Sequence, residues 1–437
     1  MARRSYHATL APSAEHAPSY YAATLRETVA TQPFEGAREC EVCVIGGGYA
    51  GLAAALHLAR QGTQVVLLEQ SRLGWGASGR NGGQAHVGMR RDQPWLESRV
   101  GMAVARRYWQ LALAAREHLD WLIDSYGIQC DFRPGLLHVN HRARYGEATR
   151  RHVEHLQQAY DYPHIRFVER EELGSLVASE SYHSGSFDAR GGHLHALNYA
   201  LGIARAAASH GASLHERSEV TGLRRSGARW CVSTARGEVR AAKVILACNG
   251  YHRGLAPLVE RHVMPINNYI AVTEVLGPER ATALIRNGAA VSDSRFVVNY
   301  FRLTPDHRLL FGGGENYSYH FPRDIGAFVR PHVLQVFPQL QDTRFDFAWG
   351  GTLGITPTRM PLVREIEPGL INASGYSGLG VLMAPFAGKA VADALHGERA
   401  AFELLGTLPP PAFPGGVALR WPTLVAAMTF YALRDRL

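Results

Sequence analysis

Three closely spaced glycines near the amino terminus have the spacing needed to bind a pyrophosphate. Gly46, Gly48 and Gly51 follow an apolar run and precede an alanine-rich run. Glycine at these places permits a tight turn, a close approach of the backbone to a pyrophosphate, and close packing of a helix on a strand. The start of the expected helix, at Tyr49 and Ala50, then faces the phosphates. The pattern predicts a strand, turn and helix that bind a dinucleotide.

Two further residues lie where such a unit contacts its ligand. Glu69 ends the second apolar run, eighteen residues after Gly51, and its carboxylate can accept hydrogen bonds from both ribose hydroxyls of a non-phosphorylated dinucleotide. The apolar run from Val244 to Cys248 ends at Gly250, and open α/β sheets bind ligands beyond the carboxyl ends of such strands. These positions predict a nucleotide-binding domain.

The composition argues against several other classes of protein. The net charge is +8, but the basic residues are spread along the chain, which is atypical of a nucleic-acid surface. The five cysteines are scattered and no second ligand pair accompanies Cys40 and Cys43, so neither a disulfide framework nor a metal site is expected. The apolar run 424–433 is about half the length of a membrane span. We expect a cytoplasmic protein with no secretory leader, no membrane span and no nucleic-acid partner.

At 437 residues the chain is long enough to bury two cores. Helical periodicity over 94–126 and 142–160 indicates an inserted region, three strand runs between 219 and 248 predict a β-meander, and further runs between 268 and 312 predict a separate sheet. The expected segments are an irregular arm (1–37), the first part of the nucleotide-binding domain (38–90), an inserted helical region (91–182), the second part (183–260), an antiparallel substrate-binding sheet (261–344), the third part (345–400) and a tail (401–437).

Several separated motifs resemble one family. The run Gly-Trp-Gly-Ala-Ser-Gly-Arg-Asn-Gly-Gly-Gln, from Gly74 to Gln84, carries most of the resemblance. Further matching motifs are Ser19–Tyr21, Gly191–His195, Tyr300–Thr304, Arg359–Pro361, Gly375–Val381, Phe413–Gly416 and Leu433–Arg436. The chain resembles the FAD-dependent amine oxidases of the D-amino-acid oxidase superfamily, and among them the gamma-glutamylputrescine oxidoreductases of polyamine breakdown. The resemblance implies an α/β fold, with a Rossmann-like FAD-binding domain of the glutathione-reductase type and an inserted α+β domain whose antiparallel sheet binds the substrate.

The resemblance implies FAD as the cofactor. Glycine-rich turns let backbone amides approach the flavin ring, and the positive end of a helix after Gly375 can stabilise charge on the N1 and O2 edge of the reduced flavin. Arg72 is expected to pair with a phosphate, and Val220 to contact adenine through its backbone. The residues expected along the rest of the FAD are Ala77, Ser78, Arg80, Asn81, Gly82, Gly83, Gln84, Gly378, Leu379, Gly380 and Val381.

The expected reaction is the oxidation of an amine. Hydride transfer from the substrate carbon to flavin N5 gives an imine, which water splits to an aldehyde and ammonia, while O₂ or another acceptor reoxidises the flavin. Tyr300, Arg302, Trp349 and Tyr376 are the expected substrate-site residues. Aromatic walls suit an alkylamine, and an arginine can bind a glutamyl carboxylate. Each has a structural alternative, as a core aromatic or a paired arginine of the sheet.

Other interpretations stay open at this stage. No lysine lies between Lys243 and Lys389, so either another cation assists O₂ or the acceptor is not O₂. His86 and His195 are further candidates for acid–base roles, although structural roles are common for histidine. The chain could instead oxidise glycine, sarcosine or a D-amino acid, with Arg302 binding the α-carboxylate. A non-catalytic flavin- or nucleic-acid-binding protein is the alternative of another class.

Overall fold

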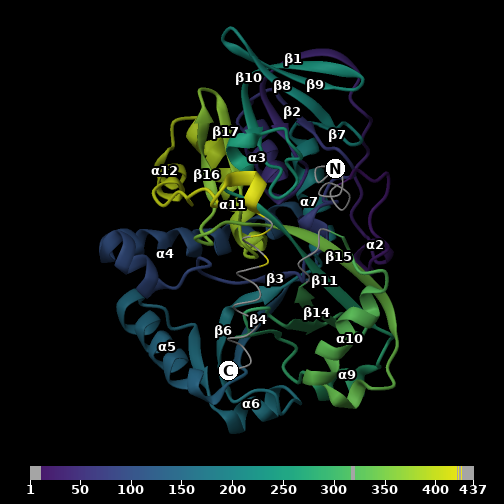
Figure 1. Ribbon diagram of the computed structural model, residues 1–437, viewed down its shortest axis with the longest axis vertical. Coiled ribbons are helices and arrows are strands. Elements are labelled where there is room, and N and C mark those ends of the chain that lie inside the picture. Colours follow the sequence, from purple (N-terminus) through teal and green to yellow (C-terminus); the bar gives the residue numbers. More distant parts are fainter. Residues whose placement is uncertain (1–10, 316–319, 421, 423–424, 426–437) are drawn as a thin grey trace.

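The computed structural model describes residues 11–315, 320–420, 422 and 425. Two β-sheets form the two halves of the molecule, one above the other in Figure 1, with helices packed against each. The closing motif at 433–436 and, apart from residue 425, the apolar run 424–433 lie outside the described residues. The predicted α/β class with a second sheet is confirmed.

The first sheet is built around β1 (Gly36–Ile45). Among the described strands its main order is β16-β17-β10-β1-β2-β7, and β1 pairs in parallel with both β2 and β10. β8 and β9 extend β10 as an antiparallel meander, as the strand runs between 219 and 248 predicted. The other strands of this sheet are β2 (Val65–Leu68), β7 (Ser213–His215), β8 (Val220–Ser226), β9 (Arg229–Thr234), β10 (Gly237–Leu246), β16 (Leu362–Glu367) and β17 (Leu370–Ser374).

Three helices pack together against the first sheet: α3 (Tyr49–Arg60), α7 (Ala196–Ser209) and α11 (Gly380–Leu395). α3 is rich in alanine, and small side chains let α7 and α11 approach it closely. The long helix α4 (Gln93–Tyr126) contacts α11 and α7 and runs between the two halves. α12 (Ala400–Gly406) packs on α11 and β16. Strands covered in this way are buried on both faces, which explains the continuous apolar run of β2.

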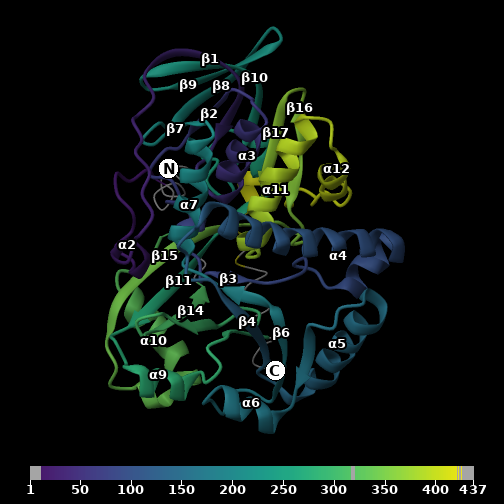
Figure 2. The same cartoon turned by 180° about the vertical axis from the view of Figure 1, so that it is seen from behind.

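The second sheet is mostly antiparallel and has the order β15-β11-β14-β13-β12-β4-β6-β3, with β5 paired to β6. In Figure 2, α5 and α6 lie at one end of this sheet and α9 and α10 at the other. Its strands are β3 (Gln84–Ala85), β4 (Arg133–Asn140), β5 (Ile165–Val168), β6 (Ser184–His193), β11 (Met264–Thr273), β12 (Ala290–Asp293), β13 (Tyr300–Leu303), β14 (Leu309–Glu315) and β15 (Phe345–Ile355). The remaining helices are α5 (Gly146–Tyr160), α6 (Arg170–Leu176), α8 (Pro257–Glu260), α9 (Pro278–Leu284) and α10 (Ile325–Val336).

The second sheet draws on more of the chain than the sequence indicated. The expected sheet covered 261–344, but β3 through β6 precede it in the chain and β15 follows it. Segments 184–193 and 345–355, assigned from the sequence to the nucleotide-binding domain, are β6 and β15 of the second sheet. Strand partners are set by long-range pairing, which the local pattern of apolar residues does not reveal.

The amino-terminal arm packs against the body at two tyrosines. Tyr20 and Tyr21 lie in the short helix α2 (Tyr20–Ala23), and both are buried. The Tyr20 hydroxyl donates a hydrogen bond to Asp306 (2.7 Å), and the Tyr21 hydroxyl donates one to the backbone carbonyl of Asn81 (2.9 Å). The arm therefore fastens the Gly74–Gln84 segment to the second sheet.

Candidate active site

A cavity of about 1150 Å³ lies between the two sheets. Its wall includes the start of α3, the start of α11 and residues of the second sheet. The two glycine-rich segments singled out from the sequence therefore meet at one site. The expected cofactor residues in this wall are Gly48, Tyr49, Ala50, Ala77, Ser78, Arg80, Asn81, Gly82, Gln84, Gly378, Leu379, Gly380 and Val381.

The turn after β1 requires glycine at two positions. Gly46 has a φ of 109°, and a Cβ there would lie 2.7 Å from the carbonyl oxygen of Ala247. A Cβ at Gly51 would lie 1.9 Å from the carbonyl oxygen of Gly46. Gly48 is the N-cap residue of α3 and offers no side chain to cap it. The positive end of α3 therefore faces the cavity, where it would stabilise a phosphate.

The start of α11 has the same character. Its N-cap residue, Leu379, makes no side-chain cap hydrogen bond, and the preceding Ser377 and Gly378 have φ values of 53° and 97°. Further along α11, Gly388 touches α3, because a Cβ there would lie only 2.2 Å from the carbonyl oxygen of Ala50. Two helix N-termini are thus held close together at the cavity.

Asn81 stiffens the turn between Ala77 and Gly83. Its side-chain nitrogen donates to the carbonyls of Ala77 and Ser78, both at 2.9 Å, and its side-chain oxygen accepts from the Gly83 amide at 2.8 Å. The Ser78 hydroxyl oxygen accepts a hydrogen bond from the Tyr49 amide at 2.9 Å. The turn is therefore fixed in shape and tied to the start of α3.

Glu69 and Arg72 make protein contacts near the end of β2. The Glu69 carboxylate accepts hydrogen bonds from the amides of Gly47 (2.7 Å) and Ser71 (2.9 Å), and burial raises its pKa to about 7. Arg72 pairs through Nε with Glu216 at 2.8 Å. Neither side chain belongs to the cavity wall, so the ribose contact of Glu69 and the phosphate contact of Arg72 stay predictions.

Other expected cofactor residues also lie outside the cavity wall. Gly46, Gly51 and Gly83 shape the two turns from within. Gly250 lets the chain after β10 approach β15, since a Cβ there would lie 3.1 Å from the carbonyl oxygen of Leu353. Val220 begins β8 in the meander. Their contacts with FAD stay predictions.

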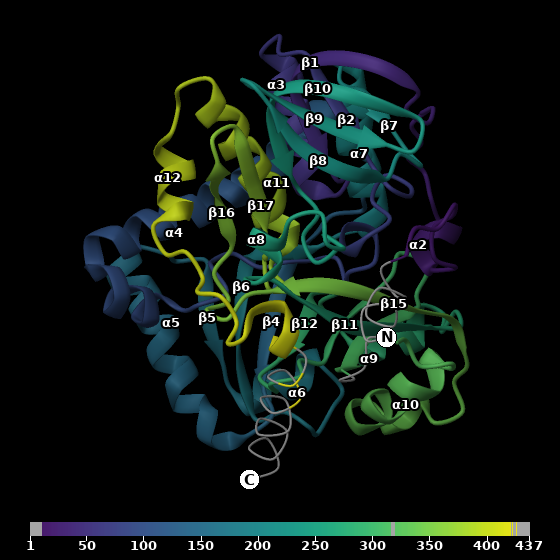
Figure 3. The ribbon, with the colours of Figure 1, turned by 45° about the horizontal axis from the view of Figure 1, so that its top comes forward.

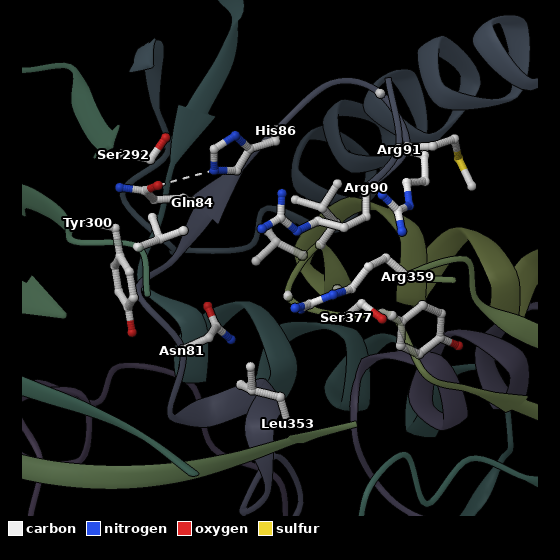
Figure 4. Close-up of a pocket in the computed structure, with 18 of the residues that line it drawn as sticks. Asn81, Gln84, His86, Arg90, Arg91, Ser292, Tyr300, Leu353, Arg359 and Ser377 are labelled. Atoms are coloured by element: carbon white, nitrogen blue, oxygen red, sulfur yellow. Dashed lines mark hydrogen bonds between the residues drawn. The ribbon is translucent and has the colours of Figure 1, made fainter. Parts of the chain in front are cut away.

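Two of the four expected substrate residues line the cavity, Tyr300 on β13 and Tyr376 before α11. The Tyr300 hydroxyl donates a hydrogen bond to the side-chain oxygen of Asn268 on β11. The Tyr376 hydroxyl is buried and has no hydrogen-bond partner within the described part of the chain, and burial raises its pKa above the ordinary value. Figure 4 shows Tyr300 on the same side of the cavity as Gln84 and Ser292.

Arg302 does not belong to the cavity, so the expectation that it binds a substrate carboxylate is corrected. Its guanidinium is buried and donates to the carbonyls of Gly82 (2.9 Å), Leu303 (3.3 Å) and Leu194 (3.0 Å), and to the Tyr21 hydroxyl (3.1 Å). Arg302 shares a face of β13 with Tyr300, but Gly82 and Leu194 cover it there. Its charge is used to hold the turn at Gly82.

Trp349 requires the same correction. It is 2% exposed and absent from the cavity wall. Its indole nitrogen donates to the backbone carbonyl of Arg80 at 3.0 Å, and its ring packs edge-on against Tyr21 with centroids 5.4 Å apart. Trp349 thus supports the Arg80 backbone from behind, in the manner of a core aromatic.

Replacing Arg302 by methionine is expected to lower the free energy of unfolding by about 3 kcal/mol, because it leaves several buried carbonyls without a donor. The ratio of kcat/KM for amines with and without a carboxylate should stay within about twofold of the wild type. Denaturant unfolding and steady-state kinetics measure the two quantities. If kcat/KM fell only for the amine that bears a carboxylate, Arg302 would be a substrate-binding residue after all.

Three arginines that the sequence did not identify as site residues form a cluster in the cavity wall. Arg90 and Arg91 follow β3, and Arg359 lies between β15 and β16. Arg91 Nε donates to the carbonyl of Thr358 at 2.8 Å, which ties the two segments together. Figure 4 shows all three arginines on the side of the cavity opposite Tyr300. The Arg90-Arg91 doublet was the available signal, but its partner lies far away in the sequence.

Arg359 adopts a backbone conformation that is uncommon for its residue type. Its φ is 65°, and non-glycine residues in this region cost energy and cluster at functional sites. The guanidinium lies 5.7 Å from the centre of the Phe296 ring, and both residues line the cavity. The strained backbone therefore presents a positive charge beside an apolar wall.

The two histidines considered from the sequence have different places. His86 lines the cavity, and its Nε2 lies 3.1 Å from the side-chain oxygen of Gln84. Burial lowers the pKa of His86 to about 3, so the ring is neutral at neutral pH. His195 caps α7, with Nδ1 accepting from the Asn198 amide at 3.0 Å. His195 is therefore a structural residue.

A β-strand, a glycine turn and a helix N-terminus at the cavity are typical of a dinucleotide-binding protein. The chain belongs to the FAD dependent oxidoreductase (DAO) family, which matches residues 41–394. It is 41% identical over 420 residues to a probable oxidoreductase, OrdL, of Rhizobium meliloti, an alignment that covers 96% of this chain and 97% of the relative. It is 37% identical over 424 residues to gamma-glutamylputrescine oxidoreductase of Escherichia coli, covering 97% and 99%.

A solved structure shows the same fold. Glycine oxidase of Geobacillus kaustophilus superposes with a TM-score of 0.73 at 21% identity, covering 86% of this chain and all of that one. The chain is thus an FAD-dependent oxidoreductase with a Rossmann-like FAD-binding domain and a second sheet domain.

The cavity suits FAD on two structural observations. The N-termini of α3 and α11, whose N-cap residues provide no side-chain cap, face it, and such termini stabilise phosphate and the electron-rich edge of a flavin. The buried hydroxyl of Tyr376, which has no partner among the described residues, lies in the same wall and can donate to a polar cofactor atom. Within the described residues no cluster of three metal-ligating side chains is found, and no helix is long and apolar enough to span a membrane.

Proposed function

We propose that the protein oxidises the primary amine of gamma-glutamylputrescine or of a related polyamine derivative. Loss of a hydride from the carbon next to the amine gives an imine, and water hydrolyses the imine to an aldehyde and ammonia. When bound, FAD accepts the hydride and passes its two electrons to O₂, which yields H₂O₂. The relative of that name, 37% identical over nearly the full chain, supports the substrate class.

The observation that carries the proposal is the position of the arginine cluster. Arg90, Arg91 and Arg359 stand across the cavity from Gln84 and Tyr300 (Figure 4). An amine held beside Tyr300 therefore has a cationic surface at the far end of its chain. A gamma-glutamyl group places an α-carboxylate there, beside its own α-ammonium group, and arginine binds carboxylates through charge-assisted, bidentate hydrogen bonds.

Three aspartates share the cavity wall with the arginines, and each accepts hydrogen bonds from other groups; Asp92 accepts one from the Trp95 amide at 3.1 Å. The Asp293 carboxylate pairs with Arg295 and accepts the Asn299 amide at 3.0 Å. Asp188 accepts the Tyr162 hydroxyl at 2.7 Å, and burial raises its pKa. Among the described wall residues, five arginines stand against three aspartates, and this excess of positive charge favours a substrate that carries a carboxylate.

The opposite side of the cavity suits the reacting amine. Hydride loss requires an uncharged nitrogen, and Gln84 and the neutral ring of His86 offer polar contacts that carry no positive charge of their own. Gln84 is held in place by donating to the carbonyl of Val291 at 2.8 Å. These residues align the amine and its α-hydrogen, and such alignment supplies a large part of the catalysis.

An oxidase of a small amino acid needs its carboxylate site next to the reacting carbon. Arg302, the residue assigned to that role from the sequence, is committed to backbone carbonyls. The arginine cluster faces Tyr300 from across the cavity instead. A longer substrate is therefore favoured over glycine or D-alanine.

The test is anaerobic reduction of the purified, FAD-loaded protein. Gamma-glutamylputrescine is expected to bleach the flavin absorbance at least about a hundredfold more efficiently than putrescine or D-alanine, since both lack a distal carboxylate. Stoichiometric H₂O₂ under air would identify O₂ as the acceptor, and its absence would indicate a different acceptor. Faster bleaching by D-alanine or glycine than by gamma-glutamylputrescine would reject the proposed substrate class.

A further inference from the structure

The chain after α12 reaches the active-site cavity although it lies outside the matched family region. The family match ends at residue 394, and Phe413, which lies beyond it, lines the cavity. Figure 3 shows the segment after α12 running from the upper half of the molecule down past β5 towards β12. This segment, 410–420, is called the tail segment below.

The tail segment is tied to the residues that lead into β11. The Phe413 amide donates to the carbonyl of Arg261 at 2.8 Å, and His262 Nδ1 lies 2.9 Å from the carbonyl of Pro410. The buried Arg420 donates to the carbonyls of Glu260 and Val263, both at 2.6 Å. Both ends of the segment are therefore anchored to one stretch of backbone.

A tight turn follows Phe413 and fixes its place at the cavity. Gly415 and Gly416 have φ values of 67° and 57°, and the Gly416 amide donates to the Phe413 carbonyl at 2.8 Å. Glycine adopts these backbone angles without strain. The chain reverses directly after Phe413, so the ring stands at the turn.

Phe413 completes an apolar wall of the cavity. It packs with Phe296 and Leu353 against a buried cluster of Met264, Ile266 and Ile355. All six of these residues also line the cavity. The same wall continues to the arginine cluster, since Arg359 lies over the Phe296 ring. An alkyl chain that connects an amine near Tyr300 to an anion near Arg359 has this wall beside it.

We infer that Phe413 is a specificity-determining residue, which makes the cavity favour substrates whose anionic end is separated from the amine by a long alkyl chain. The identity of the reacting amine rests on the proposed function. The wall itself rests on the packing of the tail segment. Burial of each methylene against such a wall tightens binding by up to about fourfold.

The test uses the FAD-loaded enzyme and the visible spectrum of its flavin as a binding signal. Straight-chain carboxylates from butanoate to octanoate serve as probes, because they carry the anion and the chain but no amine to oxidise. In the wild type, Kd should fall with each added methylene. Phe413→Ala should weaken octanoate binding about tenfold and butanoate binding less than about twofold, since the lost ring leaves a gap only beside the longer chain.

Two control variants separate a local effect from general damage. Phe413→Leu keeps an apolar side chain and should retain most of the chain-length dependence. Val417→Ala changes a residue of the same segment that is 44% exposed and should leave every Kd unchanged. Equal weakening of all carboxylates by Phe413→Ala, no change in that variant, or no chain-length dependence in the wild type would overturn the inference. If Kd depends on chain length as expected but gamma-glutamylputrescine does not reduce the flavin, the proposed function is rejected. The inference that Phe413 sets the preference for chain length would still hold.

Discussion

Replacing Arg359 by alanine is expected to raise the KM for gamma-glutamylputrescine about a hundredfold, the usual cost of removing one partner from a desolvated charge pair. The same change should alter kcat/KM for putrescine by less than about threefold, because putrescine has no carboxylate to lose its partner. The φ of 65° at this position is about as unfavourable for alanine as for arginine, so the substitution should not change the backbone strain. Steady-state kinetics with both amines measure the two effects.

Matched variants show whether the loss comes from the carboxylate contact. Arg359→Lys keeps the positive charge but lacks the planar guanidinium. Its KM for gamma-glutamylputrescine should lie about tenfold below that of Arg359→Ala. Arg225→Ala removes an exposed arginine on β8, whose side chain donates to the nearby Gly227 carbonyl at 3.2 Å, and should leave both KM values unchanged. Equal losses on gamma-glutamylputrescine and putrescine in Arg359→Ala would remove the arginine cluster from substrate recognition.

The turn after β1 could be predicted from the sequence because its chemistry is local. The carbonyl of Gly46 leaves no room for a Cβ at Gly51, and that crowding arises from residues a few positions apart. The turn before α11 could be predicted for the same reason, because Gly378 has a positive φ that favours glycine. The meeting of the two loops followed from the resemblance and is present in the structure.

The residues that line the substrate part of the cavity could not be predicted as well, because they depend on which distant segments pack together. Arg302 and Trp349 carry suitable chemistry, but Gly82, Leu194 and Arg80 approach them and use their donors. No local sequence pattern in the strands that contain Arg302 and Trp349 predicts these partners. The composition of a strand shows which residue types are present, whereas the layer above the strand decides which of them face a ligand.

Arg359 and Phe413 stood in motifs that carried the resemblance, but their place in the cavity wall, like that of Arg90 and Arg91, could not be predicted from the sequence. Arg90 and Arg359 come from opposite ends of the family region and meet only through the second sheet. Nothing in either local sequence shows that the two residues meet, in a chain that uses arginine for nearly all of its positive charge. Their function as a group is a property of the tertiary structure.

Replacing Gly388 by alanine is expected to weaken FAD binding about a hundredfold, because small displacements of preorganised groups have effects of this size. The added Cβ would lie 2.2 Å from the Ala50 carbonyl oxygen and 2.8 Å from the Ala54 amide nitrogen. Both obstacles are backbone atoms of α3, so α3 and α11 must separate. The free energy of unfolding should fall by about 2 kcal/mol, as for other overpacked sites. Titration of apoprotein with FAD and denaturant unfolding give the two values.

A second glycine provides the matched control for this substitution. Gly174 lies in α6, exposed, and a Cβ there would meet no atom within 4 Å. Gly174→Ala should leave FAD binding unchanged and stabilise the protein by up to about 1 kcal/mol, because alanine favours the helix. If Gly388→Ala bound FAD as tightly as the wild type, the close crossing of α3 and α11 would not be what positions their N-termini at the cofactor. Cofactor binding would then depend on the two loops alone, and Gly51→Ala would still abolish it through the 1.9 Å contact with the Gly46 carbonyl.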